Sequence, residues 1–376
     1  MKKFFRIFFL ALAALVALTY ATGYDYLFKA VSKTYLRGET GANINDGELF
    51  SSNKIASTQP RPWPKDSMYN KQTLSAALAD NLTKTNTAAF LVVKNGKLLH
   101  EEYWGGYSEN RATNSFSMAK AVTVLLLGKA IEEGKIKSDT QLFSDFFPNF
   151  KETEGKSLTL ENLAKMESGL DWDENYKNPF LRTAAAYYGP YVAKTVFTAD
   201  FKQKPGTAFE YQSGSTQLLG FAVRNATGSS LANYATHKIW KPLGMTNTAQ
   251  WTTDDFGVEK AFCCIHSVPK VFAKLGQLFL DNGKVDSLQY FNPEFIEKMR
   301  TPTALSKGAY GMGLWINNDA PVKHYYFWGL YGQYIIVVPE KQMVIVRTGS
   351  YKDQPEDAKG RPQQVEFIVN ESVKNF

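Results

Sequence analysis

Ser117 and Lys120 are the residues of this sequence best placed to do covalent chemistry, because together they open a long apolar stretch. Their i, i+3 spacing puts both side chains on one face of the first turn of a helix. From Met118 to Ile131 the stretch is apolar on nearly every side, which predicts a helix buried all round that ends before Gly134. An unpaired buried ammonium is costly or loses its proton, so Lys120 needs either a partner or a chemical role.

A lysine with a lowered pKa can serve as the base for a neighbouring serine. A serine hydroxyl is a weak nucleophile until a neighbour takes its proton, and burial and the positive end of a helix both favour a neutral lysine. The alternative is that Ser117 caps the helix while Lys120 extends to solvent. Residues 51–54 and 267–270 have the same Ser-x-x-Lys spacing, so the spacing alone is weak evidence. Only the Ser117 copy opens a long buried helix.

Hairpin signals at both ends of the chain predict the elements that hold this helix. Two β-rich runs flank Asn95-Gly96, and a second hairpin is expected around Pro339 to Gln342. An amphipathic helix is expected from about Gln363 to Val373, and most of the intervening chain has helical patterns. The sequence therefore predicts an α+β fold in which N- and C-terminal strands share one antiparallel sheet.

Composition excludes several classes of protein. The chain has 376 residues, 44% of them hydrophobic, enough for one large domain or two closely packed ones. Its net charge of +7 includes three basic residues at the extreme N-terminus, and without them the excess is +4, from 40 basic and 36 acidic residues. That excess is too small and too dispersed to indicate nucleic-acid binding. The four histidines are scattered, so we expect no metal site.

The first residues have the pattern of an export signal. A basic start precedes an apolar run from Ile7 to about Ala21, and small residues near the end of the run permit cleavage. The run is also nearly long enough to remain as a membrane anchor. We expect residues 1–28 to be a signal peptide or anchor, 29–85 an irregular lead-in, and 86–376 the folded domain. The protein would be exported, either periplasmic or anchored to the inner membrane.

The two cysteines, Cys263 and Cys264, are adjacent. Neighbouring side chains in an extended segment point to opposite faces, which makes an ordinary disulfide between them awkward. We therefore expect two small buried side chains, with a strained redox-active bridge as the alternative.

Further motifs in the same order resemble those of a known family. After Ser117 to Lys120 come "EEGKIKSD", "MESGLDWDE", "KPGTAFEYQSGSTQLLG", "IWKPLGM" and "AFCCIHSVPKVFAKLGQLFLDNG". Over roughly residues 86–350 this set resembles the serine β-lactamase and penicillin-recognising hydrolases. It is most similar to the branch with class C β-lactamases, esterases, D-amino-acid peptidases and, nearest, 6-aminohexanoate-dimer hydrolases. The resemblance implies a three-layer domain with helices flanking the sheet and a mostly helical subdomain.

The resemblance also implies roles for individual residues. Ser117 would be the acyl-forming nucleophile and Lys120 its proton acceptor. Tyr211 matches the tyrosine of the Tyr-x-Ser element, whose phenol would move protons to the leaving group, and Ser213 would join the same hydrogen-bond network. A tyrosine can do this only if nearby cations lower its pKa, and Lys120 is the obvious one. The alternative is that Tyr211 is simply packed in the core.

The third motif of the family is altered in this sequence. A Lys-Thr-Gly or His-x-Gly is expected on the strand beside the cleft, but the matching stretch "FWGLYGQYI" has Tyr331 and Gly332 there. The loss of a cation puts recognition of a β-lactam carboxylate in doubt. The backbone near Gly332 and Gln333 would complete the oxyanion hole with the N–H of Ser117.

Two further tyrosines are candidates for the substrate cleft. By the same resemblance, Tyr187 and Tyr188 could border the cleft, although an aromatic pair is at least as often part of a core. Trp172 and Glu174 are expected to be structural.

These expectations describe a serine hydrolase that cleaves an amide or ester through an acyl-enzyme, without metal or organic cofactor. The substrate would be a small molecule, or a peptide or oligoamide. Two alternatives stay open: β-lactamase or DD-peptidase activity, and a non-catalytic envelope protein that binds ligands in the same cleft. Contact with a membrane would come through the N-terminal segment.

Overall fold

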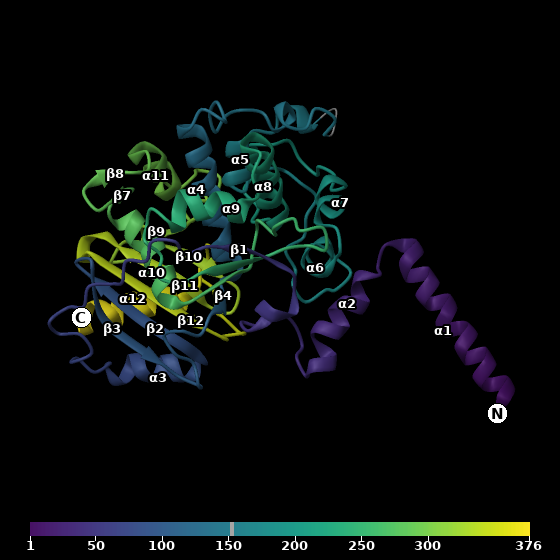
Figure 1. The fold of residues 1–376 in the computed structure, drawn as a ribbon, viewed down its shortest axis with the longest axis horizontal. Helices are drawn as coiled ribbons and strands as arrows, with labels where there is room; N and C mark the ends of the chain where they lie inside the picture. Colours follow the sequence, from purple (N-terminus) through teal and green to yellow (C-terminus); the bar gives the residue numbers. More distant parts are fainter. Residues whose placement is uncertain (151–153) are drawn as a thin grey trace.

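A six-stranded antiparallel sheet with strand order β3-β2-β12-β11-β10-β9 forms the centre of the protein (Figure 1). The computed structural model describes residues 1–150 and 154–376. The strands of this sheet are β2 (Thr87–Lys94), β3 (Lys97–Tyr103), β9 (Trp315–Asn317), β10 (His324–Gly329), β11 (Gln333–Val338) and β12 (Met343–Gly349). The first and last strands of the folded region therefore pair with each other, as the sequence predicted.

Both faces of the sheet are covered by helices, which makes three layers. Because successive side chains of a strand point to opposite faces, Leu91 and Val93 of β2 pack in one core while Phe90 and Val92 pack in the other. Helices α3 (Ala76–Lys84) and α12 (Gln363–Asn375) cover one face, and α10 (Pro269–Leu280) covers the other. The predicted α+β fold and its three layers are confirmed.

The hairpins form where the turn residues predicted them. Asn95 and Gly96 connect β2 to β3 with φ of 50° and 73°, and left-handed backbone at both positions gives the twist that a two-residue hairpin needs. A 3-10 turn at Pro339–Lys341 connects β11 to β12. The tail helix α12 begins at Gln363, also as predicted.

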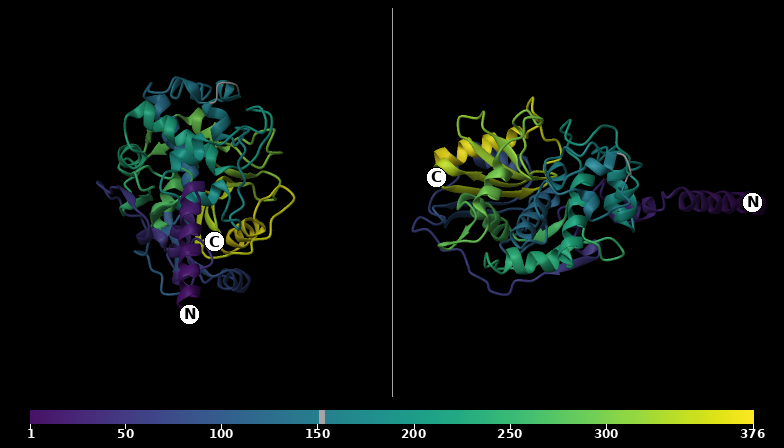
Figure 2. Two further views of the ribbon diagram at one scale, coloured as in Figure 1. Left: turned by 90° about the vertical axis from the view of Figure 1, so that its right-hand side faces the viewer. Right: turned by 90° about the horizontal axis from the view of Figure 1, so that it is seen from above.

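A mostly helical region lies beside the sheet, as Figure 2 shows from two further sides. Its centre is α4 (Ala119–Glu132), which packs against α8 (Ser213–Thr227). The other helices are α5 (Leu160–Ala164), α6 (Arg182–Tyr188), α7 (Val192–Phe197), α9 (Leu231–Ala235) and α11 (Pro293–Arg300), and a π-helical turn spans Thr236–Trp240.

A smaller four-stranded sheet connects the lead-in to the folded domain. Its strand order is β1-β5-β6-β4, with β1 (Ser52–Ile55), β4 (Thr113–Asn114), β5 (Ala249–Thr252) and β6 (Ile265–Ser267). A separate hairpin is formed by β7 (Lys284–Val285) and β8 (Leu288–Gln289). Because β1 comes from residues 29–85, that segment is tied to the domain by strand pairing.

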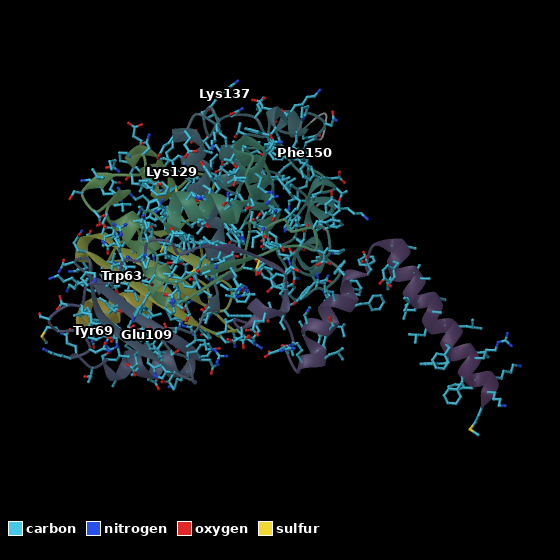
Figure 3. All side chains as sticks on the ribbon, viewed as in Figure 1. Trp63, Tyr69, Glu109, Lys129, Lys137 and Phe150 are labelled. Atoms are coloured by element: carbon cyan, nitrogen blue, oxygen red, sulfur yellow. A yellow bond between two sulfur atoms is a disulfide. The ribbon has the colours of Figure 1, made fainter. Side chains whose placement is uncertain are left out.

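The N-terminal helix α1 (Lys2–Thr22) extends away from the rest of the chain. Most of its side chains project freely (Figure 3), with Tyr20 stacked on Phe28 near its C-terminal end, and none of its residues is buried. Within residues 1–150 and 154–376 it is the one helix long and apolar enough to span a membrane, with a mean hydropathy of 2.1. Helix α2 (Tyr26–Lys33) follows and packs against α6.

Candidate active site

Ser117 lies in a tight turn between a strand and the central helix. Strand β4 ends at Asn114, a 3-10 turn spans Phe116–Met118, and α4 begins at Ala119. Phe116 has φ of 45°, which is a rare conformation for a bulky residue and marks backbone strain that surrounding contacts must hold. From residue 113 to residue 130, Ser117 is the one residue that is not buried. The turn thus exposes a single hydroxyl.

Lys120 is buried beside that hydroxyl, with only 1% of the residue exposed. Its Nζ donates hydrogen bonds to Ser117 Oγ at 2.9 Å, Ser213 Oγ at 3.1 Å and the carbonyl oxygen of Phe262 at 3.2 Å. An ammonium has three N–H donors, so all three are satisfied. Burial lowers the pKa of Lys120 to about 8, and the carboxylate of Glu174 opposes that shift. The buried charge has partners, and it is held close to the point of losing its proton.

Glu174 is a member of this network that the sequence reasoning treated as structural. The backbone N–H of Ser213 donates to Glu174 Oε2 at 2.8 Å, and the Ser213 hydroxyl donates to Glu174 Oε1. Tyr176 also donates to that carboxylate. No spacing signal could have found this contact, because 39 residues separate Glu174 from Ser213.

Tyr211 lies on the other side of Lys120. The Nζ of Lys120 is 4.8 Å from the centre of the phenol ring, and Tyr211 shares a hydrogen bond with Ser117. The sequence led us to expect that Lys120 lowers the pKa of this phenol. That expectation is wrong: burial raises the pKa of Tyr211, and the Ser117 contact only opposes the rise. In the resting site the phenol is therefore neutral.

A cavity of about 500 Å³ opens in front of Ser117. Of the catalytic and substrate-binding candidates from the sequence, Ser117, Ser213, Tyr187, Tyr188 and Tyr331 line it. Its size suits a small organic ligand. The cavity lies where the helical region meets the turn between β10 and β11.

Other segments complete the walls of the cavity. The irregular lead-in contributes residues 40–42, and two lysines at the rim, Lys177 and Lys352, are exposed. Tyr187 is fixed from behind, because its hydroxyl contacts Asp46 Oδ2 at 3.3 Å. The exposed Asp353 lies beside Lys352 in the same lining, so aromatic walls are combined with charges of both signs.

Gly332 and Gln333 are not among the described residues that line the cavity. The N–H of Gly332 donates within the turn to the Gly329 carbonyl at 3.2 Å. The side chain of Gln333 is buried and donates to the carbonyls of Leu330 at 3.0 Å and Gly349 at 2.7 Å. Both residues shape the turn from its inner side.

Residues 329–331 are the part of this turn that approaches Ser117. A side chain at Gly329 is excluded, since its Cβ would lie 2.1 Å from the carbonyl oxygen of Ser115. The guanidinium of Arg347, on β12, donates to the carbonyls of Tyr331 at 2.9 Å and Gly332 at 2.7 Å. Arg347 is fully buried, so it supports the turn from behind.

Cys263 and Cys264 form a disulfide with each other. The expectation of two separate thiols is wrong because the segment is not extended: Cys264 has φ of 73°. Cys263 lines the cavity, and the N–H of Cys264 donates to the Phe116 carbonyl at 3.2 Å. The preceding residue, Phe262, supplies the carbonyl that binds Lys120. The bridged pair therefore belongs to the wall behind the lysine.

No group of three or more His, Cys, Asp or Glu side chains that could hold a metal ion occurs within residues 1–150 and 154–376.

A sequence profile of the Beta-lactamase family matches residues 75–369. The 6-aminohexanoate-dimer hydrolase of Paenarthrobacter ureafaciens is 22% identical over 334 residues, which cover 82% of this chain and 84% of that protein.

Solved structures have the same fold. A presumptive 6-aminohexanoate-dimer hydrolase from Bacillus anthracis superposes with a TM-score of 0.76 at 23% identity, covering 88% of this chain and 92% of its own. A D-stereospecific amidohydrolase from Streptomyces sp. gives 0.63 at 13% identity, covering 80% and 99%.

Proposed function

Because this chain belongs to the Beta-lactamase family and is a serine hydrolase, we propose that Ser117 is the nucleophile that forms its acyl-enzyme and that Lys120 is the base that activates it. The observation that carries this proposal is the 2.9 Å contact between Lys120 Nζ and Ser117 Oγ. The lowered pKa of Lys120, about 8, supports it, since a fraction of the amine is neutral near neutral pH.

The partners of Lys120 direct its lone pair toward Ser117. The carbonyl of Phe262 can only accept a hydrogen bond. The hydroxyl of Ser213 also accepts, because its own proton is committed to Glu174. A neutral amine keeps two N–H donors for these two acceptors, and the remaining position, facing Ser117, holds the lone pair. Loss of one proton thus converts the satisfied ammonium into an aligned base.

The reaction then runs in two halves. Ser117 Oγ attacks the substrate carbonyl carbon while Lys120 takes its proton, and the tetrahedral intermediate collapses with expulsion of an amine or alcohol. Tyr211 delivers the proton that the leaving group needs, which suits a phenol that is neutral at rest, and Lys120 then passes the proton it took from Ser117 to Tyr211. Water attacks the ester carbonyl while Lys120 takes one of its protons, and the Ser117 oxygen leaves with that proton, which releases the acid and restores the site.

We infer that the oxyanion is bound by backbone N–H groups on two sides of Ser117. The N–H of Ser117, at the start of the central helix, is one candidate donor. Residues 329–331 offer the other, because their turn packs directly on Ser115 and lines the cavity with Leu330 and Tyr331. This revises the expected contribution of Gly332 and Gln333.

The proposed substrate is a small amide or ester, including peptides and oligoamides. The matched hydrolases are named for a 6-aminohexanoate dimer and for D-stereospecific amide cleavage. Tyr187, Tyr188 and Tyr331 would contact apolar parts of the substrate. Lys177 and Lys352 at the rim could hold an anionic group, in place of the cation missing from the third motif. Residues 1–28 would direct export and either be removed or anchor the domain 86–376.

A fluorophosphonate probe tests the nucleophile. Full-length protein in detergent is labelled and the adduct is located by peptide mass spectrometry, alongside Ser117→Ala and Lys120→Ala. Ser51→Ala is the matched control, because Ser51 and Lys54 have the same spacing in the lead-in. We expect labelling at Ser117, lost in the first two variants and kept in the control. A folded wild-type protein that stays unlabelled would instead favour a binding protein.

A further inference from the structure

Large apolar side chains are exposed around α2, beside the mouth of the cavity. We define this apolar collar by six residues whose exposed fractions run from 38% to 78%: Tyr24, Phe28, Leu36, Phe180, Tyr191 and Phe256. Single exposed apolar residues are common on soluble proteins, but clusters of them mark contact with another protein or a membrane.

One side of the collar joins α2 to the segment before α6. The rings of Tyr24 and Phe180 meet edge to face, with centres 5.8 Å apart. Tyr26 is buried next to them, and its hydroxyl donates to the Pro179 carbonyl at 2.8 Å. Phe180 is therefore held against the start of α2.

The other side joins α2 to the loop after β5. Lys29 of α2 forms an ion pair with Asp255, whose backbone N–H donates to the Pro190 carbonyl at 3.1 Å. The rings of Tyr191 and Phe256 lie 5.1 Å apart. Contacts on both sides of α2 thus connect Phe180 on one side and the Tyr191–Phe256 pair on the other to the same helix.

Three walls of the cavity continue into the collar. In each case a residue that lines the cavity and a residue of the collar are separated by three or four positions of the chain: Lys177 and Phe180, Tyr188 and Tyr191, and Thr40 and Leu36. At three places the chain therefore runs from the cavity wall to the collar within four residues.

The collar also reaches the point at which α1 leaves the folded part of the chain, because Tyr24 follows α1 directly and Phe28 stacks on Tyr20 of α1. Only three residues, 23–25, separate α1 from α2 (Figure 1). Helix α1 is apolar and unburied along its whole length, and three basic residues stand at its far end. Aromatic side chains that flank a membrane-spanning helix commonly lie at the level of the lipid headgroups.

We propose that the apolar collar inserts into the surface of the bilayer that α1 crosses, so that the active-site cavity opens at the membrane and takes an amphiphilic amide or ester whose chain is held in the lipid. The surface part of this inference stands on the collar and α1, while the substrate part rests on the function proposed above. We assign the collar to lipid because it continues into α1, whose apolar side chains are unburied. A second copy of the chain bound to the collar would still leave those side chains exposed to water.

A fluorescent probe can report whether the collar meets lipid. Full-length Phe180→Cys and Phe256→Cys variants are labelled with a nitrobenzoxadiazole thiol reagent, which spares the bridged native cysteines, and reconstituted into phosphatidylcholine vesicles with a spin-labelled lipid. The matched control is Leu288→Cys. Leu288 is 75% exposed and lies on β8, at the end of the molecule opposite α1 (Figure 1).

We expect the spin-labelled lipid to quench the probes at 180 and 256 and to leave the probe at 288 bright. Equal quenching at all three positions, or no quenching at any of them, would show that the collar does not insert into the bilayer. Emission at 180 and 256 that depends on protein concentration, and not on the spin label, would assign the collar to a second copy instead.

Kinetics test the substrate part of the inference. In a Phe180→Ser, Phe256→Ser double variant, kcat/KM for a long-chain nitrophenyl ester embedded in the vesicles should fall roughly tenfold, while kcat/KM for nitrophenyl acetate in solution is unchanged. Equal losses of kcat/KM for both esters would overturn the inference that the substrate is amphiphilic. If the parent protein cleaves neither ester, the proposed function fails. The quenching result still shows whether the collar contacts lipid.

Discussion

Two Ser-x-x-Lys segments follow paired strands of this protein, and the pKa values of their lysines are shifted in opposite directions. Thr113 of β4 pairs with Ser267 of β6. Strand β4 leads through Ser117 to Lys120 in α4, and β6 ends at Ser267 and leads to Lys270 in α10. In the first segment the lysine bonds to the serine that precedes it and the serine faces a cavity. In the second, the serine hydroxyl is buried and has no hydrogen-bond partner among the described residues.

The two lysines differ because their neighbours differ. Lys120 is surrounded by neutral acceptors, with one carboxylate behind Ser213, so burial dominates and lowers its pKa to about 8. Burial also acts on Lys270, but hydrogen bonds to Glu109 and Glu101 outweigh it and raise the pKa of Lys270. The same spacing therefore holds a lysine with a lowered pKa in one place and a lysine with a raised pKa in the other. The pKa of each lysine is therefore set by its surroundings and not by the Ser-x-x-Lys spacing.

The largest expected contrast is between the two serines. Ser117→Ala should lower kcat/KM for a nitrophenyl ester by at least about 10⁴-fold, because the variant lacks the proposed nucleophile. Ser267→Ala, which removes an unpartnered buried hydroxyl, should leave kcat/KM unchanged. Similar losses in both variants would show that the first serine acts only through packing.

The lysines should differ nearly as much. Lys120→Met should lower kcat by about 10²- to 10⁴-fold, the usual contribution of a general base. Lys120→Arg should be as inactive, because a guanidinium keeps its proton at any working pH. Substantial activity in Lys120→Arg would mean that the site needs only a positive charge. Steady-state kinetics with circular dichroism as a check on folding measure both.

Tyr211→Phe should have a smaller effect that depends on the leaving group. If the phenol supplies a proton, kcat for an amide should fall by about 10²-fold. An activated nitrophenyl ester, whose leaving group needs no proton, should lose much less. An equal loss for the two substrates would assign Tyr211 to the positioning of Ser117 alone.

Lys270→Met should affect stability and not catalysis. Glu101 is buried and accepts from Tyr69 at 2.5 Å and Tyr103 at 2.6 Å as well as pairing with Lys270 at 3.0 Å. Removing the cation leaves this carboxylate with only the phenols, so the free energy of unfolding should fall by about 1–3 kcal/mol at neutral pH. Urea unfolding measures it, and kcat should stay at the wild-type value.

The pH dependence of that loss has a definite sign. Burial alone would raise the pKa of Glu101, but the two phenols and Lys270 outweigh it, and the pKa is lowered overall. A carboxyl whose pKa is lowered by folding stabilises the protein above its unfolded pKa, and this contribution is lost as the pH falls through the folded value. The difference between Lys270→Met and wild type should therefore shrink in strong acid.

Local signals predicted the parts of the fold that depend on local physics. The turn at Asn95-Gly96 needs left-handed backbone that those residues adopt readily, and the apolar pattern of α4 was sufficient to bury Lys120. The relative placement of segments far apart in the chain could not be predicted from these local signals. Glu174 reaches Ser213 through the packing of the helical region, and residues 40–42 line the cavity because the lead-in is held by the pairing of β1 with β5 and by the hydrogen bond from Asn114 to Ile44.

Two of the expectations that proved wrong have clear physical causes. A disulfide between neighbouring cysteines is awkward in an extended segment, but Cys264 adopts φ of 73°. The pKa of Tyr211 was expected to fall because the nearby cation was considered and the burial of the phenol was not. Both depend on conformation and packing that single positions do not encode.

The pH dependence of Ser117 acylation is the most direct test of the account. The single-turnover rate with a nitrophenyl ester should fall about tenfold per pH unit below an apparent pKa near 8. Because Glu174 raises the pKa of Lys120, Glu174→Gln should move this limb to lower pH, while Glu109→Gln, beside Lys270, should leave it in place. A profile without an ionisation near 8, or one that Glu174→Gln does not shift, would contradict the assignment of Lys120 as the base.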